Sequence, residues 1–123
     1  MKISKEKFEQ LVEEAVDSLP EKFKIKLHNV AIFIENYPSK EQLKKLGVSR
    51  DYSLFGLFEG YCQAKRLNFG PVLPDRITIF RNAICQHYSN ESEIKQQIIS
   101  TVKHEIAHHL GFDEAGARKV SRS

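Results

Sequence analysis

Cysteine is scarce in this chain of 123 residues, and the two that occur, Cys62 and Cys85, form no Cys-x-x-Cys pair. Two cysteines are too few for a disulfide scaffold. No apolar run approaches the roughly 18 residues of a membrane span, and residues 1–6 turn charged at once, without the apolar stretch of a signal peptide. We therefore expect a cytoplasmic protein that contacts no membrane and keeps both thiols reduced and buried.

A strong charge excess of either sign is also missing. Nineteen Lys and Arg face sixteen Asp and Glu, and the formal charge of +3 is spread along the chain. The most basic stretch, residues 22–26, is typical of the solvated face of a helix or strand, so we expect no nucleic-acid partner. The length and the apolar share of 41% fit one globular domain over residues 1–123, in which 118–123 form a mobile tail.

Apolar residues at helical spacing predict three helices. The first begins near Ser4 and ends at Pro20. Residues 39–46 open with the pattern of a capping box and precede Gly47, which favours a short second helix. A long helix covers residues 91–110.

Three short segments have the composition of strands. The run 29–35 is almost wholly apolar and rich in branched residues, which predicts a strand covered on both faces. Residues 76–81 form a second clear strand pattern. The segment 54–61 carries large apolar residues broken by Gly56 and Gly60, which is typical of an edge strand or of a close backbone approach.

The long helix contains an H-E-x-x-H motif formed by His104, Glu105 and His108. Residues four apart lie on one helix face with Cβ atoms about 5–6 Å apart, so two imidazoles can bind one ion. Both histidines point away from the apolar face of the helix. Zinc accepts such nitrogen ligands, and in a catalytic site Glu105 would hold a water molecule as general base.

A third ligand is expected just after the helix. Gly111 turns the chain, and Asp113 and Glu114 follow, so that a carboxylate can return over the histidines. Glu114 is the preferred ligand and Asp113 the alternative. The carboxylates would otherwise only begin the next helical turn, where the helix dipole favours them.

The other histidines have less specific surroundings. His109 lies near the edge of the apolar face and is interpreted as a hydrogen-bonded histidine of the core or beside the ligands. His28 and His87 are expected to be ordinary histidines, although His87 or Tyr88 could reach the site from the preceding segment.

The chain resembles the small bacterial zincin-like metallopeptidases, or minimal zincins. The resemblance is carried by residues 101–111, which include the motif, together with residues 73–81 and 54–60, and it extends over roughly residues 5–117. It implies an α+β fold in which a small mixed sheet of three to four strands packs against helices, one of which carries the motif.

The same resemblance implies a zinc ion held by His104, His108 and Glu114, with Glu105 as the catalytic carboxylate. The third acid is often Asp in this family and is Glu here. The only methionine is Met1, so the downstream methionine turn of a full metzincin is absent.

Two functions follow as hypotheses. The first is a zinc-dependent peptidase that hydrolyses peptide bonds in a peptide or protein substrate. Tyr61, Tyr88 and Arg118 are its candidates for transition-state stabilisation, and segment 54–61 is the candidate edge for pairing with an extended substrate. The second is a metal-stabilised module that binds peptides or proteins without hydrolysing them.

Overall fold

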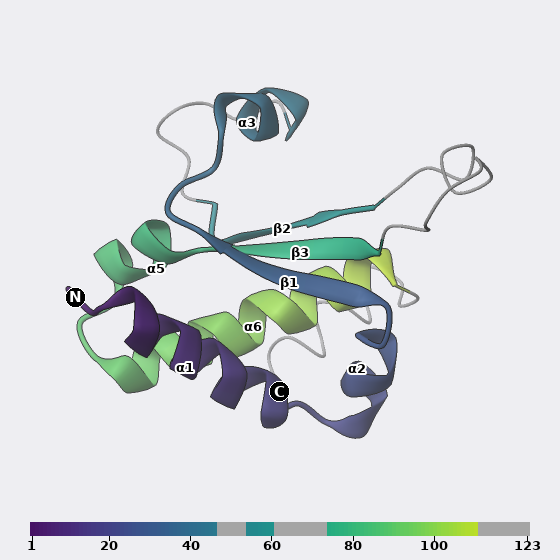
Figure 1. Cartoon of the computed structure of the whole chain (residues 1–123), viewed down its shortest axis with the longest axis horizontal. Helices are drawn as coiled ribbons and strands as arrows, with labels where there is room; N and C mark the ends of the chain where they lie inside the picture. Colours follow the sequence, from purple (N-terminus) through teal and green to yellow (C-terminus); the bar gives the residue numbers. More distant parts are fainter. Residues whose placement is uncertain (47–53, 61–73, 111–123) are drawn as a thin grey trace.

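The computed structural model describes residues 1–46, 54–60 and 74–110. The elements run in the order α1 (Lys5–Asp17), α2 (Glu21–Lys26), β1 (Val30–Glu35), α3 (Lys40–Leu46), β2 (Gly56–Glu59), β3 (Asp75–Phe80), α5 (Arg81–His87) and α6 (Glu91–His109) (Figure 1).

The three strands form one mixed sheet in the order β1-β3-β2. β1 pairs in parallel with β3, and β2 pairs antiparallel to β3 on the other side. Helices α1 and α6 cover one face of the sheet, while α3 lies beyond the opposite face (Figure 1). The predicted α+β fold with a small mixed sheet is therefore confirmed.

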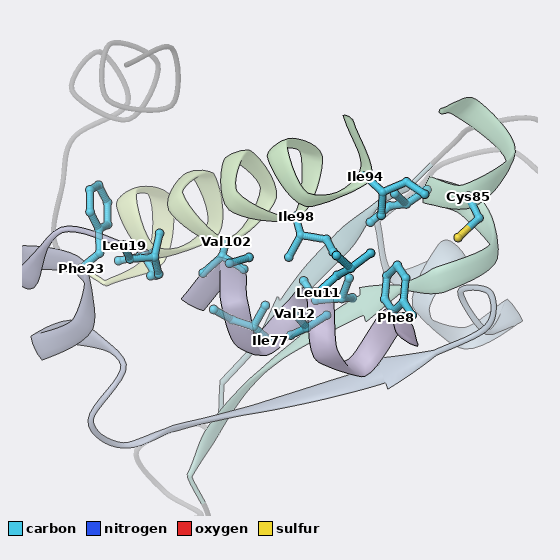
Figure 2. Packing of buried hydrophobic residues seen from close by; sticks show 14 residues of the cluster. Phe8, Leu11, Val12, Leu19, Phe23, Ile77, Cys85, Ile94, Ile98 and Val102 are labelled. Carbon is cyan, nitrogen blue, oxygen red and sulfur yellow. The ribbon is translucent and has the colours of Figure 1, made fainter. Parts of the chain in front are cut away.

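The core fills the space between the sheet and the two covering helices. Its largest fully buried side chains come from α1, α2, β3, α5 and α6: Phe8, Phe23, Ile77, Ile79, Ile84, Ile94, Ile98 and Ile106. Figure 2 shows Phe8, Ile77, Ile94 and Ile98 among them. Because α6 contributes apolar residues along almost its whole length, the core fixes the direction in which its other face points.

Side-chain caps fix the starts of the helices where the sequence predicts them. The Ser4 hydroxyl accepts from the Lys7 N–H at 3.1 Å, and Asn90 caps α6 in the same way. Before α3, the Ser39 hydroxyl accepts from the Gln42 N–H at 3.1 Å, and the Gln42 side chain accepts from the Ser39 N–H at 2.8 Å. This reciprocal pair confirms the capping box.

Two expectations about these elements are wrong. β1 is not covered on both faces, because the Phe33 side chain is 45% exposed, and it is also an edge strand of the described sheet. The apolar side chains of β1 have different neighbours on its two faces. Ile32 and Ile34 pack against the core, whereas the guanidinium of Arg76 lies 4.2 Å from the centroid of the Phe33 ring. Helix α1 also ends at Asp17, before Pro20, which instead precedes α2.

Helix α5 has no counterpart among the predicted elements. Its buried residues Ala83, Ile84 and Cys85 are consecutive and so show no helical period, and its N-cap residue, Phe80, makes no side-chain cap. The predicted burial of Cys85 is confirmed, and this burial raises the pKa of its thiol. Gly47, Cys62 and the predicted tail 118–123 lie outside the described residues.

None of the helices in this described part of the chain is both long and apolar enough to cross a membrane.

Gly56 marks the closest approach between β2 and α6. A Cβ atom at this position would lie 2.3 Å from the Cγ2 methyl of Thr101 on α6 and 3.2 Å from the Thr78 carbonyl oxygen. Only glycine at this position therefore allows β2 to lie this close to α6. The close approach predicted from the glycines of this segment is observed here.

We expect Gly56→Ala to destabilise the fold by about 1–3 kcal/mol, because the new methyl group overpacks a contact between backbone-anchored atoms. Adding Thr101→Ser should recover part of the loss, since it removes the Cγ2 methyl and keeps the hydroxyl that accepts from Gln97. Denaturant unfolding of both variants measures this; an unchanged free energy of unfolding in Gly56→Ala would contradict it.

Candidate metal centre

The histidine pair of the motif lies on the face of α6 that the core leaves uncovered. Ile98, Val102 and Ile106 on the opposite face are at most 1% exposed, whereas His104 is half-buried and His108 is exposed. The two imidazole rings meet edge to face with centroids 4.9 Å apart. The predicted orientation of both histidines is confirmed.

The carboxylate of Glu105 is turned inward, against β2. Its side chain is only 14% exposed. Desolvation by this burial raises its pKa to about 7, although a hydrogen bond from the Phe58 backbone acts in the opposite direction by stabilising the charged form. A carboxyl group with such a pKa can both accept and release a proton near neutral pH.

The pairing of β2 explains why a backbone group is available to Glu105. The Phe80 N–H donates to the Phe55 carbonyl at 2.9 Å, and hydrogen bonding alternates along an antiparallel pair. Leu57 therefore bonds toward β3, while Gly56 and Phe58 direct their backbone groups toward the other side, where α6 lies. The sheet edge and the motif helix thus meet at Glu105.

His109 holds the same carboxylate from the other side. Its Nε2 lies 3.2 Å from Oε2 of Glu105, and its ring stacks on Phe58 with centroids 4.8 Å apart and planes 7° from parallel. Partial burial lowers the pKa of the imidazole, and the neighbouring His108 and His104 lower it further. These surroundings favour the neutral form of the His109 ring, whose Nε2 lies in contact with the Glu105 carboxylate.

The contact gives His109 a polar partner, as expected, whereas its place beside metal ligands stays a prediction. It is not a core residue, since its side chain is 45% exposed. Sequence reasoning did not identify Phe58 as a partner of Glu105. The glycines of segment 54–61 were the one available signal, because they indicated an edge strand and a close backbone approach.

A cleft of about 270 Å³ lies beside these groups, between β2 and α6. Its lining comes from both elements and the residues before β2: Leu54, Phe55, Gly56, Gln97, Ser100, Thr101, His104 and Glu105. The α6 wall is ordered by a short chain of hydrogen bonds, in which Tyr88 donates to Gln97 and Gln97 donates to Thr101, at 2.5 and 2.9 Å.

The remaining histidines are placed as follows. His28 is exposed, as expected. The His87 ring meets Phe55 edge to face at 5.1 Å and has Nδ1 2.9 Å from the Ala83 carbonyl oxygen. The rings of His87 and Tyr88 both contact Phe55, which lines the cleft. His87 and Tyr88 therefore lie beside the Phe55 end of the cleft and not beside the histidine pair.

The third metal ligand expected from the sequence, Glu114 or Asp113, lies outside the residues that the structure describes. Within residues 1–46, 54–60 and 74–110, no group of three His, Cys, Asp or Glu side chains is arranged to hold a metal. Gly111, Asp113 and Glu114 lie outside these ranges, as do Tyr61 and Arg118. The described part of the chain therefore shows the two imidazoles and the Glu105 carboxylate of the motif, and no complete ligand set.

Comparison with known proteins identifies the family to which this arrangement belongs. The family model of zincin-like metallopeptidases matches residues 27–121, which include the whole sheet and α6. The chain belongs to the zincin-like metallopeptidase family. The resemblance predicted from the sequence is thus confirmed, and zinc binding and peptidase activity are supported as general properties of the family.

A solved structure has the same fold as this zincin-like protein. It is a conserved hypothetical protein from Thermo thermophilus, with 24% sequence identity and a TM-score of 0.58. The similarity covers 94% of this chain and 99% of the other. No curated protein matches the chain significantly. The bacterial origin and the cytoplasmic location stay predictions.

The burial of Glu105 predicts a pH-dependent stability of the metal-free protein. The folded state holds its proton up to about pH 7, whereas an unfolded chain releases it near 4.5. The contribution to stability is therefore present below pH 4.5 and is lost as the pH rises to 7, on the order of 3 kcal/mol.

We expect Glu105→Gln to remove this loss, so that the chelated variant exceeds the chelated wild type in stability at pH 8 but not at pH 4. Urea unfolding at both pH values measures the difference. Glu14→Gln, which alters an exposed carboxylate on α1, is the control. Equal stability of Glu105→Gln and the wild type at pH 8 would contradict the assigned burial.

Proposed function

We propose that this protein is a zinc-dependent metallopeptidase, in which His104, His108 and Glu114 hold one zinc ion and Glu105 is the general base. The observation that carries the proposal is the arrangement around α6. Two imidazoles lie side by side on its uncovered face, and the carboxylate between them in the motif is held at the rim of a cleft by Phe58 and His109.

The described residues fit a zinc ion in their donor chemistry. Zinc binds imidazole nitrogen, and two histidines four residues apart on one helix face can reach one ion. The buried apolar side chains Ile98, Val102 and Ile106 lie on the other side of α6, which leaves this face to the histidines. When bound, zinc supplies a Lewis acid that lowers the pKa of a water ligand to about 7 and polarises a carbonyl group.

The proton transfers fall to Glu105. As a carboxylate, it takes a proton from the attacking water, and as an acid it delivers that proton to the leaving amine. A pKa near 7 suits both steps, and the hydrogen bond from the Phe58 backbone together with the contact to His109 Nε2 keeps the carboxylate in one orientation. A buried base with two fixed partners loses little conformational freedom when a substrate arrives.

The edge of β2 is the proposed docking site for an extended peptide substrate. Gly56 lines the cleft and directs its backbone groups away from β3, so a peptide can add to the sheet beside the histidines. The short strand supplies main-chain recognition, which is compatible with many side chains. This favours a peptide or protein substrate over a small molecule.

Zinc content tests the metal site. We expect about one zinc per chain after chelation and re-equilibration with zinc, and none in the double variant His104→Ala/His108→Ala. His28→Ala, an exposed histidine away from the motif, is the matched control and should bind zinc like the wild type. Elemental analysis of dialysed protein gives the ratio, and unchanged zinc in the double variant would contradict the proposal.

Glu105→Gln separates metal binding from hydrolysis. We expect it to retain zinc and to cleave a mixed peptide library at least about a hundredfold more slowly than the wild type, because general-base catalysis is lost. Mass spectrometry of the library, with and without chelator, measures cleavage. Tight binding of library peptides without chelator-sensitive cleavage by the wild type would instead support the metal-stabilised binding module.

The third ligand is tested by comparing two neighbouring carboxylates. We expect Glu114→Ala to weaken zinc binding more than about a hundredfold, beyond the loss typical of a residue outside the ligand shell. Asp113→Ala should have a smaller effect. Competition with a chromophoric chelator measures both affinities, and the opposite order would assign the ligand to Asp113.

A further inference from the structure

A second groove lies at the sheet edge opposite the candidate metal centre. It runs between α1 and β1 and has a volume of about 600 Å³. Figure 1 shows α1 and β1 alongside one another at this edge, whereas β2 lies at the other edge of the sheet. The floor of the groove is apolar, formed by Val12 and Val16 of α1 and by Ile32 and Ile34 of β1.

The helical wall of this groove is acidic. Glu9, Glu13 and Asp17 follow one another at intervals of four residues along α1, and all three are exposed. Lys5 is the one basic residue among the groove's described lining residues. A row of three carboxylates in a chain whose net charge is +3 indicates a local preference for a positively charged occupant.

The spacing of these carboxylates matches an extended chain. Positions four apart on a helix are separated by about 6 Å along its axis. Alternate side chains on one face of a strand are separated by about 6.6 to 6.8 Å. A strand beside β1 can therefore place a Lys or Arg at every second position opposite Glu9, Glu13 and Asp17, with the aliphatic stems lying on the apolar floor.

β1 can provide the backbone partner for such a strand. It is an edge strand, and no other strand of the described residues pairs with its outer side. On the face away from α1, the Phe33 ring is 45% exposed with the Arg76 guanidinium over it, and its exposed part offers an apolar contact to the intervening residues of an added strand. Alternating basic and apolar side chains would thus meet matching surfaces on both faces.

The acidic wall also argues against a second copy of this chain as the occupant. If β1 paired with β1 of another copy about a two-fold axis, the rows Glu9, Glu13 and Asp17 of the two α1 helices would flank the same continuous sheet. Six carboxylates on one side of the joined edge would repel one another. The same charges favour a basic strand of a different protein.

We propose that the groove between α1 and β1 binds an extended segment of a partner protein in which basic and apolar residues alternate, by strand addition to β1. This site is independent of the proposed peptidase function, because none of its described lining residues belongs to the histidine motif or to the cleft beside it.

The test uses a fluorescent peptide of sequence Val-Lys-Val-Lys-Val-Lys-Val and fluorescence anisotropy with the full chain. A peptide of the same composition in the order Lys-Val-Val-Lys-Lys-Val-Val is the control for alternation. The variant Glu9→Gln/Glu13→Gln/Asp17→Asn should bind the alternating peptide about tenfold more weakly, the combined effect of three surface ion pairs.

A matched variant keeps the change in net charge the same. Glu6→Gln/Glu14→Gln/Glu21→Gln alters three exposed carboxylates that do not line the groove and should bind like the wild type. Thermal unfolding checks that both triple variants fold. The variant His104→Ala/His108→Ala should also bind normally, which separates this site from the proposed metal centre.

Strand addition is tested by methylating backbone amides of the peptide. N-methylation of the three lysines blocks one edge of the strand, and N-methylation of the valines blocks the other. We expect one of these peptides to lose binding and the other to retain it. Equal binding of both, equal binding of the non-alternating peptide, or unchanged binding by the groove variant would each overturn the proposal, as would dimerisation of the free chain through β1 in sedimentation.

Discussion

The burial of the Glu105 carboxylate between α6 and the edge of β2 is the contact on which the candidate site depends. It exists because Gly56 lets the strand approach the helix to a distance that a methyl group would forbid. The same approach brings the Phe58 backbone and the His109 ring onto the carboxylate. Desolvation then raises the pKa of Glu105 to about 7, so a packing contact sets the chemistry of the site.

Helix α6 joins the two requirements of this fold, stability and chemistry, in one element. Its buried face contributes Ile94, Ile98, Val102 and Ile106 to the core, and this packing prevents the helix from rotating. His104 and His108 are thereby fixed on the outer side, next to the cleft. The buried Glu105 carboxyl group works against maximal stability, and the apolar face and the Asn90 cap offset that cost.

Much of this arrangement could be predicted from the sequence, because it rests on local patterns. The helical period over residues 91–110 predicted the side on which its histidines lie, Ser4 and the capping box at Ser39 predicted helix starts, and the glycines of segment 54–61 indicated an edge strand. A single helix face and a single side-chain cap require no knowledge of distant residues.

The features that sequence reasoning missed depend on contacts between distant segments. β1 is an edge strand because of the strand order in the sheet, which cannot be inferred from its apolar composition. The buried residues of α5 are consecutive and therefore show no helical period. The link from Phe58 to Glu105 is a backbone contact and has no side-chain signature at all. The groove beside β1 likewise arises only when α1 and β1 are brought together.

The central claim is that α6 presents His104 and His108 to one zinc ion beside the edge of β2. Anomalous diffraction at the zinc edge from crystals of the zinc-loaded protein tests it most directly. We expect one strong peak about 2.0–2.1 Å from a nitrogen of each imidazole, with an oxygen ligand from the chain after α6. A zinc ion bound elsewhere, or no peak between the two histidines, would contradict the claim.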